Sequence, residues 1–171
     1  DLAEPEITSS NWSPEVSLTY TPTDDLTVFG ALKKAYKSGS FTIAMVPAPG
    51  ANNSFGDEKA EGGEIGIKSR LAGRRLLTNI AGYYYKYTGL QVGAIALPDA
   101  GRLPVISVFN AGAARVYGID FDASYRPRNV EGLEITASIN WNHGTYTRLE
   151  GIPCWSGQTV ALGCDQIINT S

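Results

Sequence analysis

The chain has 171 residues, of which 43% are hydrophobic and only 18% are charged, and its net charge is −3. The negative charge argues against a nucleic-acid binder, which would carry a basic patch. No apolar run is long enough for a membrane-spanning helix, and no signal peptide is visible at the start of the sequence.

The first predicted element is a β-hairpin with strands over residues 14–21 and 26–36. Pro22 and Asp24 lie between the strands, and both residue types favour turns. Val16 and Leu18 alternate with polar residues, which is typical of a strand with two different faces.

The second predicted element is a hairpin with strands over residues 63–71 and 76–87, joined by a turn at 72–75. In its first strand Ile65 and Ile67 alternate with polar residues. The register of its second strand stays open, because both faces carry tyrosine: Tyr83, Tyr84, Tyr85 and Tyr87.

The third predicted hairpin has the clearest alternation, with strands over 117–125 and 133–141 around a turn at 127–132. Its apolar rows span about nine residues each, which is the length a tilted strand needs to cross a bilayer core. A turn centred near Asn129 predicts Phe121 opposite Ala137. The apolar residues are Tyr117, Ile119, Phe121, Ala123, Tyr125, Leu133, Ile135, Ala137, Ile139 and Trp141.

Aromatic and basic residues end these apolar rows. Tyr117 and Trp141 close one end and Tyr125 lies near the other, as expected of rings at the two membrane–water interfaces. Beyond the first end, Arg115 and His143 are expected to face each other at headgroup level, where a cation can meet lipid phosphate. The alternation by itself also fits a soluble antiparallel sheet with one solvated face.

The connections between the hairpins are much longer than the turns within them. They cover residues 37–62, 88–108 and 145 to the end, and are rich in Gly, Pro, Ala, Asn and Ser. Long loops at one end and tight turns at the other are typical of outer-membrane barrels, and a compact soluble domain rarely has three such loops. The sequence therefore predicts an all-β chain: an antiparallel transmembrane β-barrel segment of about six strands in three hairpins.

Four stretches carry a family resemblance: residues 12–26, 34–41, 64–69 with 87–92, and 110–112 with 118–120. Residues 34–41 read Lys-Ala-Tyr-Lys-Ser-Gly-Ser-Phe, with Ala35 and Ser40 where the family pattern has glycine. Residues 110–112 read Asn-Ala-Gly, followed by Gly-Ile-Asp, with Asp120 in place of glutamate. In this order the stretches resemble the barrel domain of TonB-dependent outer-membrane receptors.

The resemblance implies a barrel of about 22 strands in the outer membrane of a Gram-negative bacterium, with a plug domain in its lumen. Residues 1–171 would then be part of the barrel domain, an internal fragment without the plug, the remaining strands or the N-terminal segment that contacts TonB. Such a fragment has exposed strand edges and is expected neither to insert nor to transport alone.

By resemblance, the function is energy-coupled uptake of a scarce nutrient: an iron–siderophore complex, a vitamin or a carbohydrate. The implied partners are outer-membrane lipid, TonB and the nutrient. No enzyme activity and no cofactor are expected, and no metal ligands either, because the family binds iron chelates whole.

Candidate ligand contacts follow from side-chain chemistry. Tyr36, Lys37 and Phe41 lie at one loop root, and Trp155 lies in the last loop; aromatic rings there can stack on sugars or on aromatic iron chelates. Cys154 and Cys164 are expected to form a disulfide worth about 3 kcal/mol at most, which implies an oxidising compartment; two free thiols are the alternative.

The sequence offers no recognisable catalytic site. His143 has no partner at a spacing that would predict a triad. The acidic residues Asp120, Asp122 and Glu134 are expected to be solvated in the lumen, hydrogen-bonded to the plug or to basic neighbours such as Lys68 and Arg70.

Two alternatives to the receptor remain open on the sequence. A secreted β-sandwich that binds carbohydrate would pack residues such as Phe121 and Ile135 against a second sheet. A passive porin would need no plug.

Overall fold

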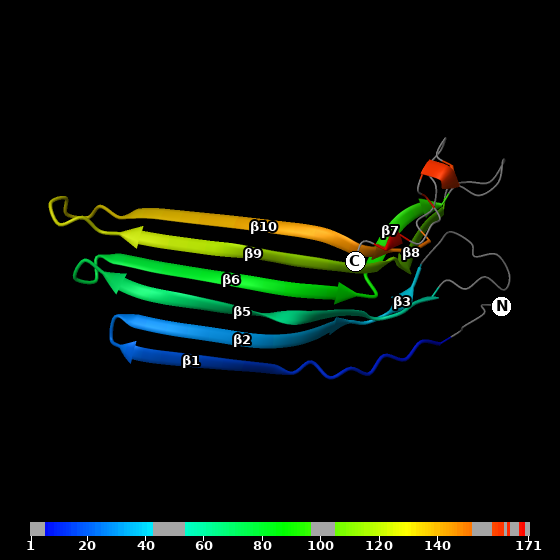
Figure 1. Ribbon diagram of the computed structural model, residues 1–171, viewed down its shortest axis with the longest axis horizontal. Coiled ribbons are helices and arrows are strands. Elements are labelled where there is room, and N and C mark those ends of the chain that lie inside the picture. The colour runs from blue at the N-terminus through cyan, green and yellow to red at the C-terminus, as the bar shows by residue number, and fades with distance from the viewer. Residues whose placement is uncertain are drawn as a thin grey trace.

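The computed structural model describes residues 6–42, 54–96, 105–151, 159–162, 164 and 168–169. Its main feature is one antiparallel sheet in the order β1-β2-β5-β6-β9-β10-β11, with six long strands side by side (Figure 1). The strands are β1 (Glu15–Thr23), β2 (Leu26–Lys37), β5 (Glu58–Leu71), β6 (Leu76–Thr88), β9 (Gly112–Tyr125) and β10 (Ile135–Leu149), with the short β11 (Ile168–Asn169).

The three predicted hairpins are the pairs β1–β2, β5–β6 and β9–β10. Their short turns gather at one end of the sheet, and the long connections leave from the other end (Figure 1). These two ends are called the turn end and the loop end below. The predicted division into tight turns and long connections is therefore confirmed.

The loop end carries further short elements. β3 (Ser40–Phe41) pairs with β4 (Ser54–Phe55), and β7 (Gln91–Ala96) pairs with β8 (Val105–Asn110). One turn of 3-10 helix covers Val160–Leu162, and no helix within the described residues has the length and hydrophobicity to span a bilayer. The β7–β8 hairpin occupies a stretch that the sequence prediction treated as connection.

The turn between β5 and β6 has an unusual backbone. Ala72, Gly73 and Arg74 have φ values of 52°, 66° and 67°, and the amide of Arg75 donates to the carbonyl of Leu71 over 3.1 Å. Glycine adopts this region freely, whereas Ala and Arg adopt it at a cost.

The register of the third hairpin differs from the prediction by two residues. Phe121 lies opposite Ile139, and not opposite Ala137. The difference arises because Leu133 and Glu134 stay in the turn: the Leu133 amide donates to the Val130 carbonyl over 3.4 Å, and β10 begins only at Ile135. A shift of two residues preserves which face each side chain occupies.

Directly paired residues share a face of the sheet, so the registers define two faces. The apolar face carries Val16, Leu18, Tyr20, Val28, Leu32, Ile65, Ile67, Ile80, Tyr84, Tyr117, Ile119, Phe121, Ile135, Ile139 and Trp141. The polar face carries Glu15, Lys33, Glu64, Lys68, Asn79, Asp120, Asp122, Ser138 and Asn140, with Phe29, Tyr83, Tyr85 and Tyr87. Three tyrosines of β6 thus lie on the polar face and one on the apolar face, which settles the register left open by the sequence.

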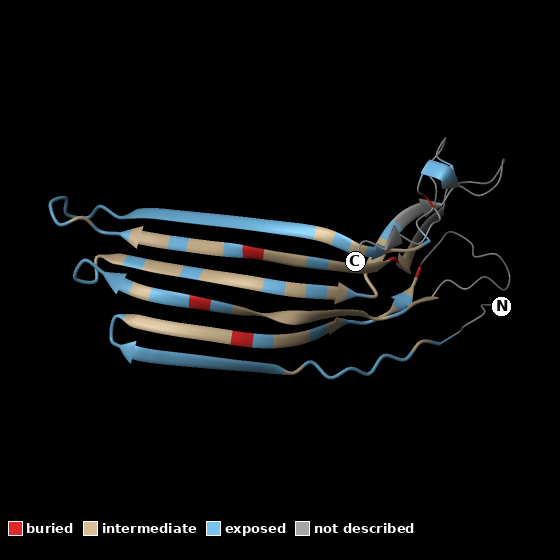
Figure 2. Cartoon of the chain, in the orientation of Figure 1, coloured by how far each residue is buried: buried red, intermediate tan, exposed pale blue. Residues whose placement is uncertain are grey.

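The apolar face is not covered by protein within the described residues. Leu18, Ile65 and Ile139 expose 74%, 67% and 62% of their surface, and buried positions are few along the strands (Figure 2). An exposed apolar surface of this extent indicates a binding or membrane-facing surface.

The apolar rows have the length of a membrane-spanning strand. From Tyr117 to Tyr125, β9 advances about 27 Å at about 3.4 Å per residue. A strand tilt near 40° leaves roughly 20 Å along the membrane normal, close to the apolar band of about 25 Å in outer-membrane barrels.

Candidate functional site

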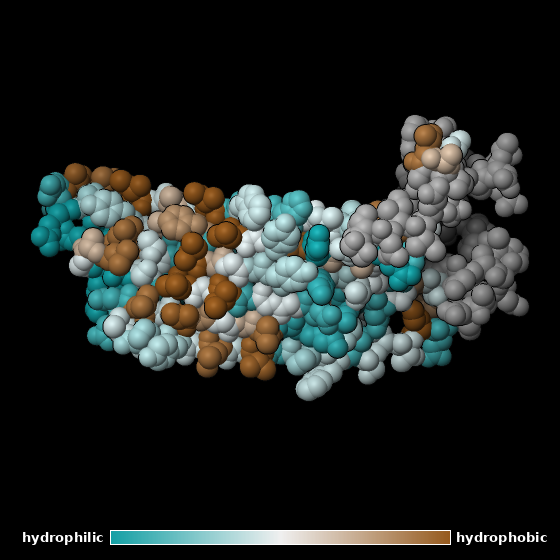
Figure 3. All heavy atoms as spheres, viewed as in Figure 1, coloured by the Kyte–Doolittle hydropathy of each residue, from teal (hydrophilic) through white to brown (hydrophobic). Residues whose placement is uncertain are grey.

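Hydrophobic side chains form an oblique band across the sheet, with hydrophilic atoms on both sides of it (Figure 3). A cluster of rings lies at the loop side of the apolar rows. Tyr117 lies 6.3 Å from Tyr84, 6.0 Å from Trp141 and 5.3 Å from His143, measured between ring centroids. Rings with polar tips suit the boundary between lipid and water.

The predicted girdle residues occupy the apolar face, but their neighbours differ from the prediction. Arg115 faces Lys86 and Thr145, whereas His143 faces Tyr117. The two-residue shift in register separates Arg115 from His143. At the turn end, Tyr125 lies between its partners Leu76 and Ile135. Contact of these residues with lipid stays a prediction.

Acidic and amide side chains of the polar face pair with one another. The Asn140 amide donates to Asp120, and Ser138 Oγ donates to Asp122 over 2.7 Å. Asp122 also accepts from Asn79 over 3.4 Å. Asp120 and Asp122 therefore have neutral partners within the described chain.

The basic residues of this face have other partners. Lys33 Nζ lies 3.1 Å from Glu64 and 3.7 Å from Glu15. Lys68 Nζ lies 5.2 Å from the centre of the Phe29 ring, and Arg70 donates to the Asp24 carbonyl over 3.1 Å. The two aspartates therefore do not pair with Lys68 or Arg70 within the described residues, whereas Glu134 does pair with a basic neighbour, Arg126, over 3.1 Å. Contact of these carboxylates with a plug stays a prediction.

Aromatic rings of the polar face cover glycines on neighbouring strands. A Cβ added at Gly118 would lie 2.5 Å from Tyr83 Oη, and one at Gly62 would lie 2.7 Å from Tyr85 Cδ1. Covering a strand glycine with a cross-strand ring restores packing that the missing side chain cannot provide. These tyrosines therefore pack along the wall of the sheet.

A carboxylate at the loop end, on Asp57, connects three separate segments of the chain through hydrogen bonds. Asp57 accepts hydrogen bonds from the side chains of Asn11 and Ser9 and, over 2.7 Å, from the Gly39 amide. The Asn11 bond, followed by those of Gly39 and Ser9, holds the pKa of Asp57 below its usual value. Asp57 thus ties the chain before β1 to the roots of the β2 and β5 loops.

Two amide side chains extend this network. Asn110 accepts from the Gly56 amide over 2.6 Å and donates to the carbonyls of Gly56 and Gly89 over 3.0 and 2.6 Å. The Gln91 amide donates to the carbonyls of Lys37, Ser38 and Gly56. Both residues belong to the family-like stretches, but no role could be predicted for them because their partners are distant in the chain.

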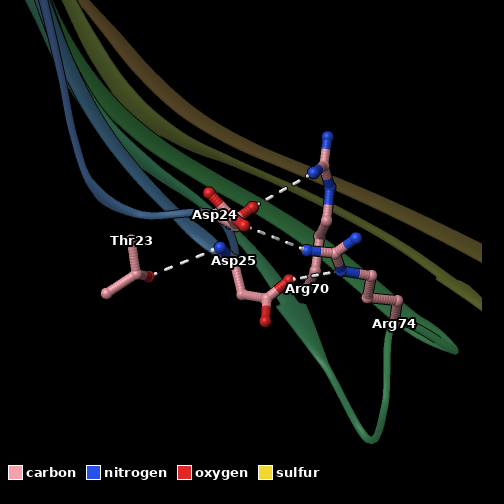
Figure 4. Close-up of polar contacts among 5 residues, drawn as sticks. All are labelled: Thr23, Asp24, Asp25, Arg70 and Arg74. Atoms are coloured by element: carbon pink, nitrogen blue, oxygen red, sulfur yellow. Dashed lines mark hydrogen bonds and ion pairs between the residues drawn. The ribbon is translucent and has the colours of Figure 1, made fainter.

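A second cluster joins two turns at the opposite end (Figure 4). Arg74 Nε lies 2.7 Å from Asp25, and Arg74 Nη2 lies 3.8 Å from Asp24. The hydrogen bond with Asp25 raises the pKa of Arg74. The pair links the β1–β2 turn to the β5–β6 turn and so helps to set the spacing of two hairpins.

The predicted ligand contacts are spread over different surfaces. Tyr36 faces Lys59 on the apolar face, and Lys34 Nζ lies 5.1 Å from the centre of its ring. Lys37 faces Glu58 on the polar face, and Phe41 pairs with Ser54 in the β3–β4 ladder. The structure thus does not bring these three residues to one surface.

Two other predicted positions, Trp155 and Cys154, lie outside the described residues. Cys164 is buried and takes part in a disulfide. Its pairing with Cys154 stays a prediction.

His143 lies in the girdle region, with Nε2 2.9 Å from Thr145 Oγ1. No three His, Cys, Asp or Glu side chains converge as metal ligands in the part of the chain that the structure covers. The geometry is that of a wall with two chemically different faces.

The family model described as TonB-dependent receptor-like β-barrel matches residues 3–165. Among curated proteins, none matches the chain significantly.

Three solved receptors share the fold. The ferric yersiniabactin uptake receptor FyuA of Yersinia pestis is 23% identical with a TM-score of 0.60, over 78% of this chain and 18% of that one. The FrpB iron transporter of Neisseria meningitidis is 20% identical with a TM-score of 0.56, over 81% and 20%. The alcaligin outer-membrane receptor FauA of Bordetella pertussis is 19% identical with a TM-score of 0.54, over 81% and 23%.

The chain therefore spans about a fifth of the length of these receptors. The match also rules out the β-sandwich alternative, because the family model that covers residues 3–165 is that of a β-barrel. The two-faced sheet, the tight turns at one end and the family match agree: this chain belongs to the TonB-dependent receptor family of the Gram-negative outer membrane and forms part of the wall of its β-barrel.

Proposed function

We propose that the chain is a section of the barrel of a receptor that takes up an iron–siderophore complex by transport coupled to TonB. The observation that carries this proposal is the pairing of an exposed apolar face with a hydrogen-bonded polar face on one sheet. Such a sheet can stand between lipid and a wet lumen.

The substrate class rests on the similar receptors. The solved structures are described as a ferric yersiniabactin uptake receptor, an iron transporter and an alcaligin receptor. Two of the three names specify a siderophore, which favours an iron chelate over a vitamin or a carbohydrate for this chain.

The barrel needs further strands to function. Within the described sheet β1 has a partner on one side only, and lipid does not tolerate an unpaired strand edge. Additional strands would close the barrel, a plug would fill its lumen, and an N-terminal segment would contact TonB. The receptor carries its substrate without altering it covalently, so we propose no enzymatic role.

Uptake measurements test this function. A strain that produces the complete receptor is given iron labelled with a radioisotope and bound to a panel of catecholate, hydroxamate and phenolate siderophores. We expect uptake of at least one chelate, and we expect it to stop when TonB is deleted. Uptake that continues without TonB would instead indicate a passive porin, and transport of vitamin B12 or a sugar alone would refute the substrate class.

A further inference from the structure

A row of charged side chains, three of them basic and one acidic, crosses the apolar face just beyond the ring cluster, towards the loop end. Its members are direct neighbours on successive strands: Lys34 on β2, Glu61 on β5, Lys86 on β6 and Arg115 on β9. On its strand, each member lies two residues nearer to the loop end than the residue in the row of Tyr84 and Tyr117. The row therefore lies where the membrane interface follows the apolar band.

Lys86 and Arg115 are an unfavourable pair in isolation. They lie directly opposite each other on adjacent strands, and both are exposed. Like charges in this position repel, and no carboxylate within the described ranges forms an ion pair with either of them. The one acidic member of the row, Glu61, forms its ion pair with Lys59 over 3.0 Å. It also lies directly opposite Lys34 and Lys86 and attracts both, but at distances beyond an ion pair.

Arginines at the turn end show the contrast. Arg74 lies 2.7 Å from Asp25, and Arg126 lies 3.1 Å from Glu134. Carboxylates thus lie beside cations in the turns, whereas Lys86 and Arg115 form no ion pair with a described carboxylate on the apolar face.

We propose that Lys86 and Arg115 bind the phosphate of an anionic lipid headgroup in the outer leaflet. A phosphate placed between Lys86 and Arg115 would neutralise their repulsion, and a guanidinium can hold it through two parallel hydrogen bonds. The long aliphatic stems let both side chains remain at the interface while their charged ends reach the headgroup.

The position of the row selects the leaflet and the kind of ligand. Long loops of outer-membrane barrels face the outside of the cell, so the loop end lies at the outer leaflet. The row is on the apolar face and not on the polar face, so a nutrient in the lumen cannot be the ligand that these side chains bind. The inference depends on the apolar face meeting lipid, and it is independent of which nutrient is transported.

Lipid binding to the complete receptor tests the site. The receptor is purified in a neutral detergent, and native mass spectrometry counts the lipids that remain bound after addition of phosphatidic acid or of phosphatidylcholine. We expect preferential binding of phosphatidic acid. The double variant K86Q/R115Q should bind it roughly 25-fold more weakly, because each basic side chain near a membrane surface contributes about fivefold.

Two further double variants are the controls. K37Q/K68Q removes the same charge from the polar face and should leave lipid binding unchanged, whereas K86R/R115K keeps both charges and should retain it. Equal losses in K86Q/R115Q and K37Q/K68Q, or no loss in either, would overturn the proposal. Displacement of phosphatidic acid by millimolar inorganic phosphate would identify a site for free phosphate and would also overturn it.

Discussion

Ile139 lies directly opposite Phe121 on the apolar face, joining β10 to β9 in the middle of the third hairpin. The registers place both side chains on the apolar face, with Ile80 as the next neighbour of Phe121. The neighbouring pair, Asn140 and Asp120, points to the other side and is hydrogen-bonded. Successive residues of these strands therefore lie on the apolar face and on the polar face in turn. The assignment to a barrel wall depends on this alternation.

This register predicts which cysteines can be cross-linked. Opposite residues in an antiparallel pair have Cα atoms about 4.5–5.5 Å apart, within disulfide range, whereas diagonal neighbours are about 7–8 Å apart. In the complete receptor, F121C/I139C should form a disulfide under mild oxidation and F121C/A137C should not. Faster cross-linking of F121C/A137C than of F121C/I139C would support the register expected from the sequence and contradict the structure.

Gly118 should be intolerant of a side chain. Its Cβ would collide with the Trp141 carbonyl of the neighbouring strand and lie 2.5 Å from Tyr83 Oη. We expect G118A to destabilise the barrel by about 1–3 kcal/mol, as overpacking does, measured by the urea midpoint of the heat-modifiable band in gel electrophoresis. The matched control is G82A, whose Cβ would approach only the Gly118 carbonyl, at 3.9 Å; equal effects of the two changes would count against the packing described here.

Asn110 should hold the loop roots together. Removing its side chain in N110A leaves the Gly56 amide without its acceptor and the Gly89 carbonyl without its donor, at a local cost of about 1–3 kcal/mol. Hydrogen exchange should show lower protection of the Gly56 amide. The control is N140A, which removes a side-chain amide that contacts an exposed carboxylate on the polar face; it should leave the protection of the Gly56 amide unchanged. Unchanged protection of this amide in N110A would show that Asn110 does not hold the loop roots together.

The same loop end should loosen in acid. The pKa of Asp57 in the folded protein lies below its ordinary value of 3.8, so its contribution is complete above that pH and is lost as the pH falls through the lowered pKa. The protection factor of the Gly39 amide, which donates to Asp57, should therefore decrease in that window. In D57N the decrease should be absent; an identical acid response in D57N would assign the transition to another group.

Much of this architecture could be predicted from the sequence because alternation in a strand is local. Residues 117–125 alternate so regularly that their division between two faces is correct even though the register is two residues off. The register depended on how many residues the turn retains, and Leu133 looks like a strand residue until its amide is seen to bond to Val130. In β6, tyrosine is compatible with the apolar face and with the polar face, so the sequence of that strand does not show which tyrosines lie on which face. The two faces are told apart by glycines on neighbouring strands, over which the rings of the polar face pack.

The loop-end network could not be predicted in the same way. Asp57 and Gly39 are 18 residues apart, and Asn110 and Gly56 are 54 apart. Nothing in the local pattern brings such residues together. The hairpin β7–β8 was overlooked because its residues lie between Gly- and Pro-containing stretches that resemble a loop.

In the complete receptor, lipid is expected to cover the apolar face and water to reach the polar face. Single nitroxide labels at residues 119–122, 139 and 140 of the complete receptor, reconstituted in liposomes, test it most directly. We expect labels at 119, 121 and 139 to be accessible to dissolved oxygen in the bilayer, and labels at 120, 122 and 140 to be accessible to a water-soluble nickel chelate. Uniform accessibility, or alternation of the opposite sense, would contradict it.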